Sequence, residues 1–202
     1  MTLPTPINLT VLGDAGVGKT ALLLSFTLDL FSSTYLPTCI EGLVAKVEKN
    51  SQSFEIHLYD TPGGNYDEVC RVLYPDKKDR LFINALHPTP DVVLVCYSVT
   101  SPATLQSVKD KWVSELKKRL PGIPWLLVGT KIDRRDNVKP KPPGLLTQEE
   151  GVAAAETLGA MGYLECSSFT QDGVKAILDE VVMAPRQPRE EKKKKKSSCL
   201  IQ

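Results

Sequence analysis

The sequence predicts an α/β domain in which helices cover both faces of a six-stranded, mostly parallel sheet with one antiparallel hairpin strand. Short apolar runs of β character alternate with helical patterns along the chain, which is typical of doubly wound folds. Three of the runs are nearly all apolar, as expected for strands covered on both faces. The expected strands are residues 7–12, 43–48, 54–59, 92–99, 125–130 and 162–166, with 43–59 as the hairpin.

Two of the expected helices carry start signals. Ser101 precedes Pro102, which suits the first position of a helix. Thr147 lies three residues before Glu150, the spacing of a capping box. Residues 171–183 supply a last helix. The apolar face of the helix that follows Ser101 consists of Leu105, Val108, Trp112, Val113 and Leu116.

The composition is that of one globular domain with a basic tail. Of the 202 residues, 42% are hydrophobic and 24% are charged. Residues 185–202 contain seven basic and two acidic side chains, so they carry +5 of a net charge of +1 and leave −4 on residues 1–184. We therefore expect a folded domain over 1–184 and a flexible tail over 185–202 that seeks an anionic surface, and no nucleic-acid partner.

The cysteines and the N-terminus both indicate the cytosolic side. The five cysteines are odd in number and form no C-x-x-C pair, which suits a reducing compartment without structural disulfides or zinc. The first residues lack the charged start and apolar run of a signal peptide, and no stretch has the length of a membrane span.

The strongest chemical signal is GDAGVGKT, residues 13–20, between the first expected strand and a helix. It matches G-x-x-x-x-G-K-[ST], in which backbone N–H groups, here those of residues 14–20, wrap a diphosphate. Lys19 can reach the outer phosphates and Thr20 can offer its hydroxyl to Mg²⁺. A glycine-rich turn without a ligand is the alternative, but the strand–loop–helix context favours phosphate binding. The motif itself does not choose between ATP and GTP.

Two later segments favour guanine. TKID, residues 130–133, ends the fifth expected strand, and ECSS, residues 165–168, ends the sixth, where ligands bind in such sheets. Asp133 can accept hydrogen bonds from guanine N1–H and N2–H₂, the Lys131 stem can cover the base, and ECSS can present a backbone N–H to guanine O6. Alone, Asp133 has an ordinary explanation as a turn residue. TKID and ECSS follow the fifth and sixth expected strands in that order, and this placement favours a role for Asp133 in binding the base. At this point the chain resembles the small Ras-like GTPases.

The resemblance narrows to the Rho family and covers residues 7–202. YLPTCIE at 35–41 looks like the Rho-type switch I, and 101–116 and 163–180 resemble that family's third helix and its last strand and helix. The ending KKKKKSSCLIQ is similar to its polybasic, prenylated tail. The resemblance implies a P-loop GTPase (Ras-like) fold over 1–184, with GTP or GDP and Mg²⁺ as cofactors.

The resemblance also implies roles for individual residues. Thr38 would bind Mg²⁺ and sense the γ-phosphate, Phe31 would pack against the base, and Tyr35 would cover the phosphates. Asp60 would hold Mg²⁺ through water, and Gly63 would donate its N–H to the γ-phosphate. The expected metal site is Thr20, Thr38 and Asp60. The expected nucleotide site is Asp14, Ala15, Gly16, Val17, Gly18, Lys19, Thr20, Ala21, Phe31, Tyr35, Thr38, Asp60, Gly63, Thr130, Lys131, Asp133, Ser167 and Ser168.

The stretch DTPGGN, residues 60–65, departs from the family at the position that orients the attacking water. Gly64 stands where the family has a glutamine, so we expect no catalytic side chain there. Asn65 is shorter and displaced by one residue, and Pro62 replaces an alanine and lacks an N–H. Ala15 replaces a glycine, where its methyl can crowd a partner's arginine finger. Water orientation and that finger together supply up to about 10⁵-fold in rate in the best-studied cases.

The sequence thus predicts a Rho-like GTP-binding switch with weak or absent GTP hydrolysis. The first alternative is a cycling GTPase that uses Asn65 or a partner's residue to place the water. The second alternative is an ATP-using kinase, which TKID disfavours. The resemblance implies effectors bound through switch I and switch II, and exchange factors and a guanine-dissociation inhibitor as further partners.

Two more segments depart from the Rho pattern. Residues 75–90 include an insertion, and a flexible extension and a partner-binding element are both open interpretations. Residues 137–146, NVKPKPPGLL, replace a charged helical insert and contain three prolines, so no helix is expected there.

The C-terminal CLIQ fits C-a-a-X with Cys199 as the lipidated residue, and Gln202 favours farnesyl. The lysines 192–196 would add attraction to an anionic leaflet, because one lipid alone holds weakly. A solvated tail or a nuclear localisation signal is the alternative reading of the lysine run. We expect lipid anchoring at the cytoplasmic face of the cell membrane, with some protein cytosolic.

Overall fold

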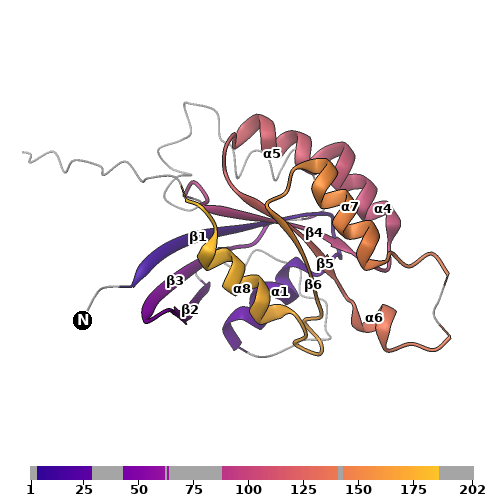
Figure 1. Cartoon of the computed structure of the whole chain (residues 1–202), viewed down its shortest axis with the longest axis horizontal. Helices are drawn as coiled ribbons and strands as arrows, with labels where there is room; N and C mark the ends of the chain where they lie inside the picture. Colours follow the sequence, from indigo (N-terminus) through magenta and orange to yellow (C-terminus); the bar gives the residue numbers. More distant parts are fainter. Residues whose placement is uncertain (1–3, 29–42, 62, 64–87, 141–142, 187–202) are drawn as a thin grey trace, which may run out of the picture.

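One six-stranded sheet runs through the computed structural model, which describes residues 4–28, 43–61, 63, 88–140 and 143–186 (Figure 1). The strand order is β2-β3-β1-β4-β5-β6, and neighbouring strands are parallel except for β2 and β3. The predicted fold class is confirmed. The strands are β1 Thr5–Leu12, β2 Leu43–Lys49, β3 Gln52–Tyr59, β4 Val92–Ser98, β5 Trp125–Thr130 and β6 Gly162–Cys166.

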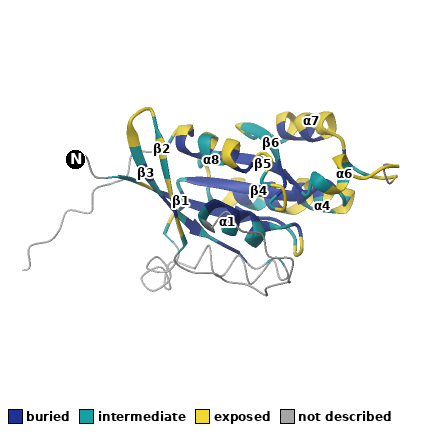
Figure 2. Ribbon diagram, turned by 90° about the horizontal axis from the view of Figure 1, so that it is seen from below, coloured by how far each residue is buried: buried dark blue, intermediate teal, exposed yellow. Residues whose placement is uncertain are grey.

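Helices cover both faces of the sheet. One core cluster joins α1 and α8 to the sheet, and the other joins α4, the π-helical turn η1, α5 and α7 to its opposite face. Strand β4 divides its side chains between the two clusters, which explains why all of it is buried (Figure 2). The helices are α1 Lys19–Leu28, α4 Pro102–Ser107, η1 Val108–Trp112, α5 Val113–Arg119, α6 Asp133–Asp136, α7 Gln148–Leu158 and α8 Val174–Met183.

The predicted hairpin is confirmed as the antiparallel pair β2 and β3. Asn50 and Ser51 form its turn with φ of 51° and 61°. Positive φ at both central residues is the pattern of a type I′ turn, whose twist matches that of the flanking strands.

The expected helix after Ser101 is correct in position but not regular. Ser101 is the N-cap residue and Pro102 begins the helix, yet the Ser101 side chain makes no capping hydrogen bond. The helix is interrupted at η1, where the Val113 N–H donates to the carbonyl oxygen of Val108, five residues back. All five predicted apolar residues are buried in spite of this interruption.

The other predicted features of the helical layer are confirmed. The Thr147 N–H donates to Glu150 Oε2 at 2.8 Å and the Glu150 N–H to Thr147 Oγ1 at 3.3 Å, which completes the capping box. Within 137–146, the described residues 137–140 and 143–146 contain no helix.

None of the described helices is long and apolar enough to cross a membrane. The described structure continues to Arg186, whose guanidinium lies 5.6 Å from the Phe54 ring centre.

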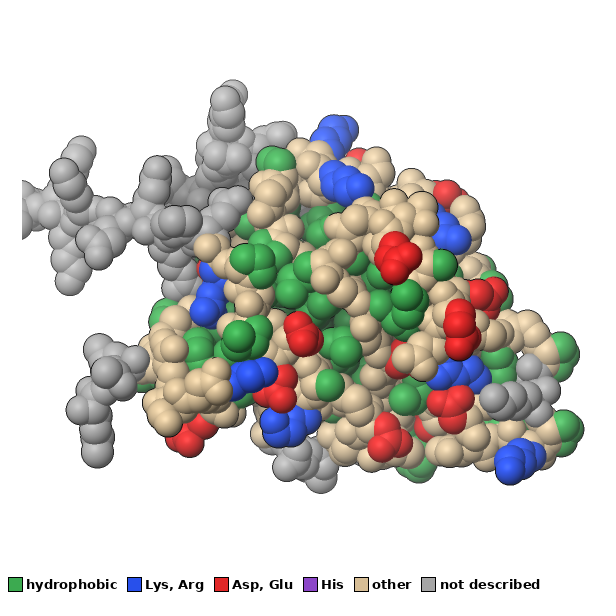
Figure 3. All heavy atoms as spheres, viewed as in Figure 1, with side chains coloured by type: hydrophobic (Ala, Val, Ile, Leu, Met, Phe, Trp, Pro, Cys, Tyr) green, Lys and Arg blue, Asp and Glu red, His purple; other side chains and the backbone are tan. Residues whose placement is uncertain are grey.

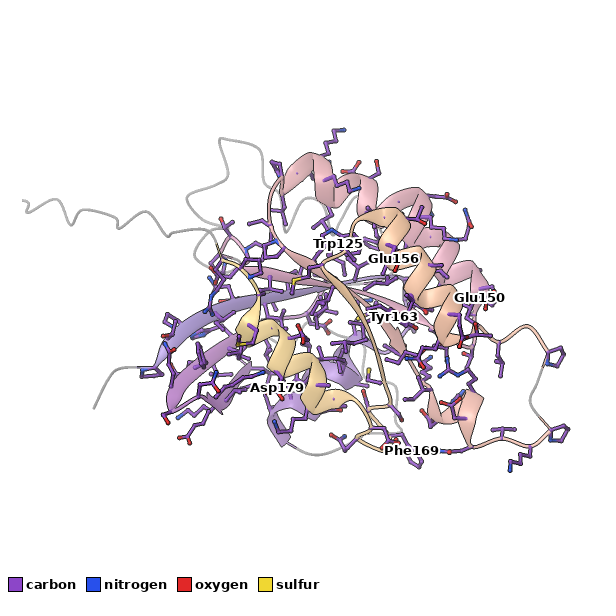
Figure 4. The ribbon with its side chains drawn as sticks, viewed as in Figure 1. Trp125, Glu150, Glu156, Tyr163, Phe169 and Asp179 are labelled. Atoms are coloured by element: carbon purple, nitrogen blue, oxygen red, sulfur yellow. The ribbon has the colours of Figure 1, made fainter. Side chains whose placement is uncertain are left out.

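Tyr163 of β6 fills a space between the sheet and α7 that two glycines leave open (Figure 4). A Cβ at Gly151 of α7 would overlap the tyrosine ring, and one at Gly129 of β5 would lie 2.7 Å from its hydroxyl oxygen. That hydroxyl lies 2.6 Å from Tyr97 Oη and donates to Glu165 Oε1 at 2.6 Å. The ring is therefore held at both its edge and its tip.

We expect Gly151→Ala to lower the free energy of unfolding by about 1–3 kcal/mol, because the added methyl overpacks against a ring that cannot turn away. At an ordinary helix position the same change raises that free energy by about 1 kcal/mol. Urea unfolding measures the difference. Val152→Ala is the control, since Val152 is 39% exposed on the same helix and its replacement should be neutral or slightly stabilising. A Gly151→Ala variant at least as stable as wild type would show that Tyr163 moves aside.

Candidate functional site

The loop of residues 13–18 links β1 to α1 in a conformation that requires glycine at several positions, and Lys19 and Thr20 begin α1. Gly13, Gly16 and Gly18 have φ of 140°, 73° and 108°, which ordinary side chains rarely adopt. A Cβ at Gly13 would also overlap the carbonyl oxygen of Cys96 on β4. The loop is thus pressed against the carboxyl edge of the sheet, where parallel α/β sheets bind ligands.

Lys19 lies under this loop with only 6% of its surface exposed. Its Nζ donates to the carbonyl oxygens of Gly13 at 2.8 Å and Asp14 at 2.9 Å. Burial lowers the pKa of the Lys19 amine, and the Asp60 carboxylate acts in the opposite direction. The arrangement places a cation beside the loop that can bind phosphate.

Thr20 and Asp60 form the neighbouring part of the site. Thr20 Oγ1 donates to Asp60 Oδ2 at 2.5 Å, and the Thr61 N–H donates to Asp60 Oδ1 at 2.9 Å. Burial raises the pKa of Asp60, although these hydrogen bonds and the Lys19 charge act against it. A hydroxyl beside a carboxylate is a donor set that Mg²⁺ accepts, so the residues present fit the expected metal. Thr38, the third expected ligand, lies outside the described residues.

Gly63 lies against the same loop. A Cβ on Gly63 would be 2.5 Å from the Ala15 backbone N and 2.6 Å from Lys19 Nζ. The structure thus brings Gly63 against the loop of residues 13–18, and only glycine fits this close approach.

A second part of the site lies beyond the phosphate loop, where a cavity of about 310 Å³ opens beside Asp133. Ser167 Oγ donates to Asp133 Oδ1 at 2.6 Å, and Ser167 itself is fully buried. The cavity is lined by Gly18, Ala21, Thr130, Lys131, Asp133, Arg134, Ser168 and Phe169. Its size and its carboxylate suit a planar base with paired donors.

The two parts of the site are tied together by the TKID segment. Lys131, with φ of 65°, donates from Nζ to the carbonyl oxygen of Gly16 at 2.5 Å. The Thr130 hydroxyl lies 2.5 Å from the carbonyl oxygen of Val17 and 2.9 Å from that of Tyr97. Burial lowers the pKa of Lys131, and Arg134 adds to this effect. The structure thus brings the predicted TKID, ECSS and loop residues into one continuous site.

Two contributors to the base end were missed by the sequence analysis. Arg135 donates to both oxygens of Glu165, at 2.7 and 2.6 Å, and so fastens α6, which carries Asp133, to β6. The hydrogen bonds to Glu165 raise the pKa of Arg135 most, and the hydrogen bonds to Asp136 raise it further. The adjacent arginines after TKID were a signal, but sequence alone does not tell which of them faces Glu165.

Phe169, the second missed residue, follows ECSS and lines the cavity while 64% exposed (Figure 4). An aromatic side chain beside a base-sized cavity is able to stack on its ligand.

Several predicted residues lie outside the described part of the chain. These are Phe31, Tyr35 and Thr38 of the expected switch I, where Phe31 precedes the expected segment 35–41, and Pro62, Gly64 and Asn65 of DTPGGN. The 75–87 part of the insertion and Cys199 also lie outside it.

The sequence-family model of the Ras family matches residues 8–187 of this chain. The chain belongs to the Ras family. It is a P-loop small GTPase by fold and family, and the family supports a GTP-binding signalling switch. Ras-family proteins generally bind GTP or GDP with Mg²⁺, and they generally bind effectors, exchange factors and dissociation inhibitors.

The residues present fit such a nucleotide. In this Ras-family protein Lys19 and the loop N–H groups would hold the phosphates, Thr20 and Asp60 would hold Mg²⁺, and Asp133 would hold the base. The bound Mg²⁺ would supply neutralisation of phosphate charge. The chain's own residues would bind and orient the nucleotide, and the glycines would allow the main chain to approach the phosphates closely.

Asp60→Asn should separate the stability of the fold from the binding of Mg²⁺. The pKa of Asp60 is raised from 3.8, so the folded state binds this proton more tightly than the unfolded state. The resulting stabilisation is complete below the unfolded pKa and is lost as pH rises through the folded pKa. Without nucleotide or metal, we expect the melting temperature of Asp60→Asn to rise relative to wild type as pH increases from about 4 to about 7.

The same substitution should weaken nucleotide binding in the presence of Mg²⁺. Mg²⁺ should tighten GDP binding to wild type and do so much less in Asp60→Asn, as measured by titration with and without the metal. A relative melting temperature that falls with rising pH would show that the Lys19 charge outweighs burial.

Proposed function

We propose that this Ras-family protein is a Rho-like, hydrolysis-poor switch that holds GTP and presents it to effectors at the cytoplasmic face of a membrane. The observation that carries the proposal is how the polar side chains at the phosphate end are engaged. Lys19 bonds to loop carbonyls, Thr20 to Asp60, and Thr61 Oγ1 to the carbonyl oxygen of Val11. These bonds engage four polar side chains among the described residues 13–20, 60–61 and 63, which supports the proposal that none of the four orients the attacking water.

The sequence supports the same conclusion where the structure is not described. Gly64 has no side chain at the family's glutamine position, and Pro62 removes a backbone N–H from the segment. Ala15 is described and exposed, and its methyl would face an arginine finger that a partner inserts. Gly64 and Ala15 bear on different contributions to hydrolysis, since water and arginine act separately on the transition state.

A cycling GTPase is the second candidate. The observation that favours it is Asn65, an amide side chain next to the vacated position. Under this alternative Asn65, or a residue from an activating partner, positions the water and the protein alternates between GTP and GDP.

The Rho assignment draws on switch I, the third helix and the tail. The proposed partners are effectors at switch I and switch II, together with exchange factors and a guanine-dissociation inhibitor. On the face seen in Figure 3, acidic and basic side chains are interspersed over the described surface. The five lysines of 192–196 supply the attraction to anionic lipid, in a tail that we propose begins at residue 185.

Intrinsic single-turnover hydrolysis with Mg²⁺ tests the proposal. We expect wild type to hydrolyse GTP far more slowly than a glutamine-containing Rho protein assayed beside it. Gly64→Gln should raise this rate, because it restores an amide that can orient water, and adding Ala15→Gly should chiefly restore the response to a Rho-type activating protein. A wild-type rate equal to that of the reference protein would support the cycling alternative.

Membrane attachment has its own test. We expect Cys199→Ser to be soluble in cells, and replacement of Lys192 to Lys196 with glutamine to weaken or redirect attachment, since neither a single lipid nor a basic run suffices alone. Fractionation of cells that express each variant measures this. A membrane-bound Cys199→Ser variant would contradict the lipid anchor while leaving the nucleotide site unaffected.

A further inference from the structure

A tryptophan from the helical layer reaches the phosphate-binding loop. Trp112 Nε1–H donates to Asp14 Oδ1 at 2.9 Å, across 98 residues of sequence. We propose that Trp112 is a positioning residue for this loop: its hydrogen bond fixes Asp14, and with it the run of N–H groups that hold the phosphates, and so slows nucleotide release. The proposal rests on guanine-nucleotide binding by the family and not on loss of hydrolysis.

Trp112 lies at an irregularity of its helix. Trp112 is the last residue of η1, where the i→i+5 hydrogen bond from Val113 to Val108 widens the helix. Only 4% of Trp112 is exposed, and it packs in the core cluster of α4, α5 and α7. The indole is therefore rigid, and its N–H meets the loop at a fixed point.

A hydrogen bond at Asp14 restrains the loop directly before its exposed residues. The next two residues, Ala15 and Gly16, are exposed, and Gly16 has φ of 73°. Lys131 holds the carbonyl of Gly16 and Thr130 holds that of Val17, both from the β5 side. Trp112 holds the start of the loop from the helical side, so the three contacts together constrain its path from both sides.

The charge of Asp14 supports a geometric role. A carboxylate on a loop that binds phosphates repels the ligand, so on charge alone its removal should tighten binding. An acceptor for the indole N–H gives that carboxylate a compensating function, because hydrogen bonds to ionised groups are stronger than neutral ones.

Four variants and one control test the proposal. The readout is the release rate of methylanthraniloyl-GDP, measured by displacement with excess GDP. Trp112→Phe should release it about tenfold faster, as expected for loss of a hydrogen bond to a charged group. Asp14→Ala should also release it faster than wild type, but by a smaller factor, because it removes a charge that repels the phosphates. Because both changes break one bond, the double variant should be no faster than the faster single variant. Multiplying effects would overturn the proposal.

Trp125→Phe is the matched control. Trp125 is 5% exposed and packs in the same core cluster, so its replacement removes the same volume from the same layer. It should lower the melting temperature about as much as Trp112→Phe while leaving release within about twofold of wild type. Equal acceleration by the two tryptophan variants would show that Trp112 acts through stability alone and would refute a positioning role.

Asp14→Asn keeps the test decisive if Trp112→Phe does not fold. Both Asp14 variants lose the charge, but only asparagine keeps an oxygen that can accept the indole N–H. We expect Asp14→Ala to release the nucleotide several-fold faster than Asp14→Asn. Equal release rates would contradict the proposal, whereas failure of wild type to bind the probe at all would count against nucleotide binding itself.

Discussion

The burial of the Lys19 amine is the constraint on which the rest of the site depends. A cation removed from water must be surrounded by acceptors, and here the carbonyl oxygens of Gly13 and Asp14 supply them. To turn those carbonyls inward the loop adopts backbone angles open to glycine. The Asp60 carboxylate is buried as well. Burial lowers the pKa of Lys19 and raises the pKa of Asp60. Phosphates and Mg²⁺ would satisfy both charges at once.

Several hydrogen bonds hold the residues around this buried amine in place. Trp112 fastens the loop from the helical layer, Thr130 and Lys131 fasten it from β5, and Ser167 holds the Asp133 carboxylate. A site fixed in this way loses little conformational entropy when a ligand binds.

Local sequence was sufficient for the features that local chemistry determines. The apolar runs predicted the strands, and the Thr147 and Glu150 spacing predicted a capping box. GDAGVGKT, TKID and ECSS predicted a shared ligand site, and the structure brings the three segments together. The interruption at η1 was not predictable, because the helical periodicity from Leu105 to Leu116 continues through it. The Trp112–Asp14 bond and the choice of Arg135 as the partner of Glu165 depend on tertiary packing between segments far apart in sequence, and no local pattern carries that information.

The nucleotide that stays bound through purification from cells reports most directly on the proposed GTP-locked state. Wild type and Gly64→Gln would be expressed and purified in parallel with Mg²⁺ present, denatured, and their released nucleotides separated by ion-exchange chromatography. GTP on wild type and a larger share of GDP on Gly64→Gln is the result expected if the missing glutamine prevents hydrolysis. GDP on wild type would contradict the GTP-locked state and identify the protein as a cycling GTPase.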